Sequence, residues 1–209
     1  MENEKDPLYH ILDEVTTDPD YQNNVIRLKD TKIKDKEYDA TDLLTSGTTK
    51  YVYHTTEDEY VVKVEVLDVK DFNNNIKELI AMHNFDYCNT PSVIKVISKN
   101  DIVPKPKLPD NMEIEYETYS HKDIFNYCVI IWKEEKAKGT AFEYDFSDEE
   151  ITSFNKWFRV TKKDLTKFYF TDLKNKQNVG IFEKEPVFRW IDIQPKKGAD
   201  VIVGMKKKI

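Results

Sequence analysis

The chain has 209 residues, of which 39% are hydrophobic and 34% charged, and this suits one domain or a compact two-lobed one. Its formal net charge of −7 argues against broad, non-specific nucleic-acid binding, although a local basic patch stays open. The amino-terminal residues are polar and acidic, unlike a signal peptide, and no apolar run approaches the roughly 20 residues of a membrane span. We therefore expect a cytoplasmic protein that does not associate with membranes.

The first part of the chain predicts a helix, a lead-in and a β-hairpin. Apolar residues at helical spacing indicate a short amphipathic helix over residues 7–16, and a charged, weakly patterned stretch continues to about residue 42. Residues 50–54 and 59–66 are rich in β-branched and aromatic side chains, which favour strands. Residues 55–58 are polar and turn the chain between them.

The middle of the chain predicts one helix and two strands. Residues 73–85 carry apolar side chains on one helical face, and a strand over residues 93–97 follows Pro91. Prolines within residues 104–109 predict a stiff connector. The nearly continuous apolar run at residues 127–132 is typical of a strand buried on both faces.

The last part predicts a long helix followed by a short β pair. Ser147 with Glu150 three residues later forms a capping box at the start of a helix that runs to about residue 168. Strand signals follow at residues 179–182 and 187–191, so the whole pattern predicts an α+β fold. The helix has an apolar stripe that we expect to be buried: Ile151, Phe154, Phe158, Leu165 and Phe168.

Few residues stand out as chemical candidates. The four histidines are scattered, the two cysteines have no metal-ligand spacing and are expected to be free thiols, and no nucleophile elbow or Walker loop occurs. Lys63 lies within a valine-rich strand, Asp172 follows an aromatic run and Asp192 lies between isoleucines. Taken singly, Lys63 could be an exposed edge-strand lysine and Asp172 a turn residue. An unpaired carboxylate at Asp192 would be costly, so it needs a partner.

Residues 44–53 and 60–63 together resemble the phosphate loop and lysine strand of protein kinases. Gly47 falls on the middle glycine of that loop, Val52 on the valine that covers adenine, and Glu78 on the glutamate that pairs with the strand lysine. Four further segments resemble, in the family's order, the approach to the next strand, the gatekeeper strand with its hinge, the catalytic loop and the strand into the metal-binding aspartate. They are residues 90–96, residues 130–134 with the later Gly139, residues 171–174 with Asn178, and residues 190–193.

The resemblance covers roughly residues 43–195 and is greatest to the small Ser/Thr kinase domains of bacteriophages. It implies an amino-terminal helix and lead-in over residues 1–42, and a strand-rich amino-terminal lobe with one main helix over residues 43–132. A reduced, mostly helical carboxy-terminal lobe would occupy residues 133–209. Phage proteins of this kind modify or block host machinery, so the implied partner is a host protein in the host cytoplasm.

The resemblance also implies roles in ATP- and Mg²⁺-dependent phosphoryl transfer. Lys63 would neutralise the α- and β-phosphates, held in place by Glu78. Asp192 and Asn178 would hold Mg²⁺, and Asp172 would orient the accepting hydroxyl. The acceptor would be a protein Ser/Thr, with a small-molecule alcohol as the alternative.

The chain departs from the family at several positions. Thr45 and Lys50 stand where the loop's other glycines would be, which lets the backbone approach phosphates less freely. Phe170 and Thr171 replace the catalytic-loop histidine and arginine, and Asn178 lies one position late, with Asn175 as the alternative metal ligand. The residues after Asp192 are too few for the family's peptide-binding platform.

Three functions follow from this pattern. The first is an active, minimal kinase. The second is a catalytically dead kinase-like protein, a pseudokinase, that binds and inhibits a host protein. The third is an unrelated α+β interaction protein in which the order of motifs is coincidental.

Overall fold

The computed structural model describes residues 40–46, 50–98, 103–110, 112–118 and 127–196. The helix expected at residues 7–16 lies outside them, as does Gly47. By their internal contacts, the residues form two compact units. The first unit comprises the described residues within 1–72, 91–105 and 113–135, and the second comprises those within 73–90, 106–112 and 136–209. The predicted division into residues 1–42, 43–132 and 133–209 stays a prediction.

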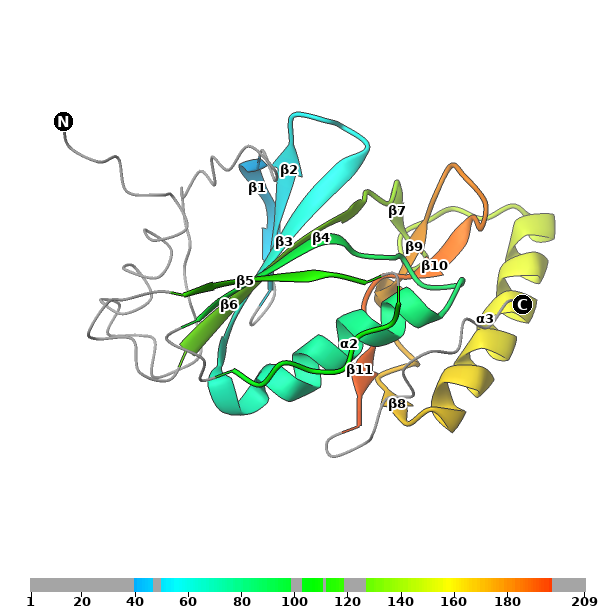
Figure 1. Cartoon of the computed structure of the whole chain (residues 1–209). Helices are drawn as coiled ribbons and strands as arrows, with labels where there is room; N and C mark the ends of the chain where they lie inside the picture. The colour runs from blue at the N-terminus through cyan, green and yellow to red at the C-terminus, as the bar shows by residue number, and fades with distance from the viewer. Residues whose placement is uncertain (1–39, 47–49, 99–102, 111, 119–126, 197–209) are drawn as a thin grey trace. The chain divides into compact units, whose positions relative to one another are not determined.

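The first unit is built on a six-stranded sheet with the order β1-β2-β3-β6-β4-β5 (Figure 1). All neighbouring strands are antiparallel except β4 and β5, which are parallel. A short 3₁₀ helix, η2 (Val69–Asp71), follows β3. The strands are β1 (Ala40–Ser46), β2 (Lys50–Thr55), β3 (Tyr60–Asp68), β4 (Ser92–Ser98), β5 (Ile114–Thr118) and β6 (Tyr127–Glu135).

The predicted hairpin is confirmed as β2 and β3, which pair in continuous antiparallel register. Its turn is closed by the Thr55 hydroxyl, which donates to the Glu57 carbonyl at 2.6 Å. The sequence prediction missed β1 and β5. The first residues of β1, up to about residue 42, fall in the predicted lead-in, and the others fall at the start of the segment that resembles the phosphate loop, so the sequence indicated no strand there. The alternation in β5, which places Ile114 and Tyr116 on one face, was obscured by the prolines before it.

Of the described residues, those in α-helices belong to the second unit, apart from Phe72 at the start of the first helix. Helix α2 (Phe72–Asn84) confirms the helix predicted at residues 73–85, and α3 (Asp148–Lys167) confirms the helix predicted after Ser147. A three-stranded sheet has the order β10-β9-β7, and β11 pairs with β8. The short elements are β7 (Gly139–Thr140), β8 (Phe170–Thr171), η3 (Lys176–Asn178), β9 (Val179–Ile181), β10 (Phe188–Trp190) and β11 (Gln194–Pro195).

The α+β class is therefore confirmed, with a strand-rich first unit and two α-helices in the described residues. The β pair predicted at residues 179–182 and 187–191 is also confirmed, because β9 and β10 pair antiparallel. Among the described residues, no helix is long and apolar enough to cross a membrane.

The core of the second unit is an aromatic cluster around α3 and β10. Phe154 and Leu165 are fully buried, as predicted. The prediction was wrong for Ile151, which is 40% exposed, and Phe158 and Phe168 are only partly buried. The helix instead buries Thr161, whose hydroxyl accepts the indole N–H of Trp190 at 2.9 Å. A polar residue could not be recognised as core from its own type, because its burial depends on that distant donor.

The capping box at the start of α3 is confirmed. The Ser147 hydroxyl accepts the Glu150 backbone N–H at 3.3 Å, and the Glu150 carboxylate accepts the Ser147 backbone N–H at 2.9 Å. That backbone N–H, with the Ser147 hydroxyl, lowers the pKa of Glu150 below its ordinary value of 4.5. The ionised Glu150 carboxylate therefore stabilises the folded state above pH 4.5, and this stabilisation is lost as the pH falls through the lower pKa of the folded state.

Replacing Ser147 with alanine should lower the free energy of unfolding by about 1 kcal/mol, because a backbone N–H at the start of the helix loses its acceptor. Urea unfolding followed by circular dichroism measures this. The control is Ser153→Ala at an exposed position inside the same helix, where alanine is the better helix former. Equal losses in the two variants would contradict a capping role for Ser147.

Candidate functional site

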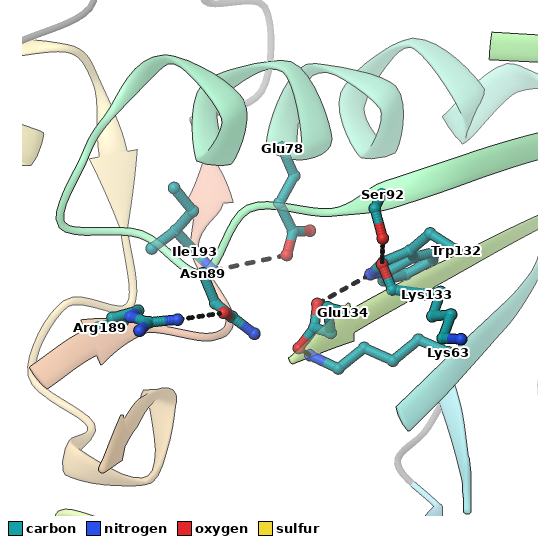
Figure 2. A network of polar contacts seen from close by, with 9 residues as sticks. All are labelled: Lys63, Glu78, Asn89, Ser92, Trp132, Lys133, Glu134, Arg189 and Ile193. Atoms are coloured by element: carbon teal, nitrogen blue, oxygen red, sulfur yellow. Dashed lines mark hydrogen bonds and ion pairs between the residues drawn. The ribbon is translucent and has the colours of Figure 1, made fainter. Parts of the chain in front are cut away.

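Lys63 lies inside the sheet of the first unit and is not an exposed edge lysine. Strand β3 runs between β2 and β6, and Lys63 is only 9% exposed. Its ammonium Nζ lies 2.7 Å from Oε1 of Glu134, a residue of β6 that is 2% exposed (Figure 2). A buried ammonium requires such a counter-charge. The alternative of a solvated surface lysine is therefore excluded.

The Glu134 carboxylate is held from both sides. While Oε1 contacts Lys63, Oε2 accepts the indole N–H of Trp132 at 3.0 Å (Figure 2). Trp132 lies directly opposite Lys63 in the register of β3 and β6, and Glu134 lies opposite Val61. Since side chains two residues apart share a face of a strand, lysine, indole and carboxylate lie on the same face of the sheet.

The residue predicted to cover adenine is on this face as well. Val52 is half-buried on β2 and lies directly opposite Lys63 in the β2–β3 register. Directly opposed residues have Cβ atoms about 5 Å apart. The Lys50 ammonium lies 5.9 Å from the centroid of the Trp132 ring. The β2–β3 register therefore brings Val52 and Lys63 together, and their roles towards a nucleotide stay predictions.

In the second unit, Asp172 and Asn178 are brought together. The amide Nδ2 of Asn178 donates to both the backbone carbonyl and Oδ2 of Asp172, each at 3.2 Å. Asp172 is exposed and has φ 56°, a left-handed conformation that aspartate tolerates better than most residues. Asn178 is the last residue of the 3₁₀ turn η3. Asn175 is used otherwise, because its side chain accepts the Gln177 backbone N–H at the start of η3.

The residues on either side of Asp192 are hydrogen-bonded to the part of the second unit that carries Asp172 and Asn178. The backbone N–H of Ile191 donates to the Asn178 carbonyl at 2.9 Å. The pairing of Gln194 with Thr171 holds the chain after Asp192 beside the chain before Asp172. Asp192 itself is half-buried. Tertiary structure thus joins segments that lie about 20 residues apart in sequence.

Glu78 also contacts this segment of the second unit. It is 5% exposed on α2, and its Oε1 accepts the backbone N–H of Ile193 at 3.4 Å (Figure 2). Burial and the charge of Glu78 raise the pKa of the Cys88 thiol. Both Cys88 and Cys128 are buried free thiols, as expected. The ion pair expected between Lys63 and Glu78 stays a prediction.

Sequence reasoning missed the role of Glu134, which it treated only as part of a strand and hinge. A signal was present in the alternation of β6, where Trp132 and Glu134 share a face. That signal has meaning only once the register with β3 is known, because a shift of one residue would turn both side chains away from Lys63.

Within the described ranges, no group of three or more His, Cys, Asp or Glu side chains could hold a metal ion by itself. Comparison of the sequence with protein-family models gives no match, and comparison with functionally curated proteins gives none either.

Proposed function

We propose that this chain is a protein-kinase-like protein that binds MgATP and transfers a phosphoryl group to Ser or Thr of a host or partner protein. One observation carries the proposal: a series of hydrogen bonds links the candidate segments of the second unit. Asp172 contacts Asn178, Asn178 contacts Ile191, and Glu78 contacts Ile193, the two isoleucines flanking Asp192. These bonds support the proposal because they bring the segments that carry Asp172, Asn178 and Asp192 together within the second unit.

The first unit supports the same proposal through the position of its lysine. In protein kinases the phosphate-binding lysine is on the third strand, and its glutamate partner is on the helix that follows. Lys63 is on β3, with Val52 opposite it, and Glu78 is on α2, the next α-helix of the described chain. In the proposed activity the Lys63 ammonium binds phosphate oxygens.

The residues present fit a magnesium ion. Mg²⁺ is usually bound through one or two carboxylates together with substrate phosphates and water, so it needs no cluster of three acidic side chains. Asp192 would supply a carboxylate oxygen. Asn178 would supply Oδ1, because its Nδ2 already donates to Asp172. The ion would neutralise negative charge on the phosphates.

Asp172 acts in this proposal on the accepting hydroxyl. Its carboxylate is exposed, so the hydroxyl of a macromolecular acceptor can reach it. The bonds from Asn178 hold one carboxylate oxygen and the backbone carbonyl, which limits the orientations of the side chain. Such positioning, together with charge compensation, is most of what phosphoryl transfer requires from a protein.

A second candidate function is a kinase-like binding protein that inhibits its partner without catalysis. One observation favours it: the charge of Lys63 is already compensated by Glu134, in a pair that could serve structure alone. Thr45 and Lys50, in place of glycines, also weaken the expected phosphate loop.

Nucleotide binding separates the two candidates. With MgATP at 100 times its dissociation constant, the free energy of unfolding should rise by about 2.7 kcal/mol. Differential scanning fluorimetry with increasing MgATP measures the accompanying rise in melting temperature. ATP with EDTA is the control for the metal, and Lys63→Met is the control for the site. A melting temperature that does not change with MgATP would contradict the kinase proposal and favour the binding protein.

A further inference from the structure

The charge of the phosphate-binding lysine is already compensated by Glu134 before any nucleotide is bound. Within the first unit, the ammonium that would bind phosphates lies 2.7 Å from a buried carboxylate. That carboxylate is not the glutamate on the helix that the sequence predicted. A polyphosphate reaching Lys63 would meet a positive charge that Glu134 already compensates.

The ion pair of Lys63 and Glu134 differs from an ordinary surface ion pair in its burial and in the fixed position of its carboxylate. Exposed lysine–carboxylate pairs contribute little to stability. The pair of Lys70 and Asp68 is of this kind, because its lysine side chain is 74% exposed. Glu134 differs because its side chain is 2% exposed and its second oxygen is fixed by the Trp132 indole. The hydrogen bond from the indole fixes the orientation of the carboxylate so that Oε1 faces Lys63.

We propose that Glu134 is a built-in counter-ion that competes with the nucleotide phosphates for Lys63 and so sets the affinity for ATP. The inference rests on the proposed function, and Glu134 is a positioning residue because it acts through Lys63. An ammonium has three donors, so Lys63 can contact both groups, but the Glu134 charge opposes the incoming phosphates. Removing that charge should therefore strengthen binding of phosphate-bearing ligands.

The decisive variant is Glu134→Gln. Glutamine keeps the shape of the side chain and removes the negative charge, and its one oxygen can accept from either the Trp132 indole N–H or Lys63. A unit charge about 4 Å from another changes the binding free energy by at least about 1 kcal/mol, which is about fivefold in affinity, so we expect ATP and ADP to bind at least about fivefold more tightly. Adenosine carries no phosphate, and its affinity should not change.

Isothermal titration calorimetry on the full chain gives these affinities for MgATP, MgADP and adenosine. Glu113→Gln is the matched control, because it removes one negative charge at an exposed position of the first unit. Circular dichroism checks that each variant is folded. If Glu134→Gln does not fold, Glu134→Asp replaces it, because the shorter side chain withdraws the carboxylate from Lys63 and should also tighten ATP binding.

The outcomes separate this inference from the proposed function. Tighter binding of ATP and ADP, with adenosine and the Glu113→Gln control unchanged, supports a counter-ion at Glu134. If wild type binds MgATP, Lys63→Met does not, and Glu134→Gln binds equally or more weakly, the counter-ion is overturned and the kinase proposal stands. If neither wild type nor any variant binds nucleotide, the kinase proposal fails and the counter-ion fails with it.

Discussion

Replacing Asp172 with asparagine should lower the rate of phosphoryl transfer by at least about 100-fold, the lower end of what a positioned acid or base contributes. The carboxylate is the group that would accept or orient the proton of the acceptor hydroxyl, and an amide cannot take it. Binding of MgATP should remain nearly unchanged, because the proposed role of Asp172 is with the acceptor. The Asn178 bond to the Asp172 backbone carbonyl would also remain.

Asp192→Asn should also abolish transfer, but through a different step. The amide keeps the shape of the side chain and removes the negative charge that Mg²⁺ needs. The variant should therefore lose the stabilisation by MgATP that wild type shows. Asp145→Asn provides the matched control at an exposed position of the second unit.

The measurement pairs incorporation of radiolabelled phosphate with calorimetric binding of MgATP, on wild type and all three variants. Transfer lost in both Asp172→Asn and Asp192→Asn, with binding lost only in the latter, would support the assigned roles. Equal transfer in wild type and Asp172→Asn would remove Asp172 from the mechanism. If wild type binds no nucleotide and both variants capture the partner protein normally, the binding-protein function is the correct one.

The second large effect concerns stability. Phe154→Ala should lower the free energy of unfolding by about 3–5 kcal/mol, because the ring is fully buried and its removal leaves a cavity. The domain's total stability is expected to be only about 5–15 kcal/mol. The ring contacts four other aromatic side chains of the second unit, with centroids 5.0–6.2 Å away: Phe146, Trp157, Phe158 and Phe188.

Chemical denaturation followed by tryptophan fluorescence checks this value. Ile151→Ala on the same helix is the control and should cost less than about 1 kcal/mol, since Ile151 is 40% exposed. If Ile151→Ala lowered the free energy of unfolding as much as Phe154→Ala does, α3 would bury a different face from the one in the structure.

The amino-acid sequence by itself determined the elements whose signals are local. The hairpin of β2 and β3, helix α2 and the capping box of α3 depend on residue type and on spacing within a few positions, which sequence periodicity records. The order of the candidate residues Lys63, Glu78, Asp172 and Asp192 was also visible, because a resemblance in chain order needs no coordinates.

Only the tertiary structure decided which of these residues have partners and what the partners are. Glu134 is opposite Val61 and beside Lys63 solely because of the register of β3 and β6, which pairs residues about 70 positions apart. Asn178, and not Asn175, bonds to Asp172 because η3 turns the chain between them. Thr161 is buried because Trp190 supplies its hydrogen bond. Contacts of this kind depend on pairing and packing between distant segments, and a local sequence pattern carries no record of them.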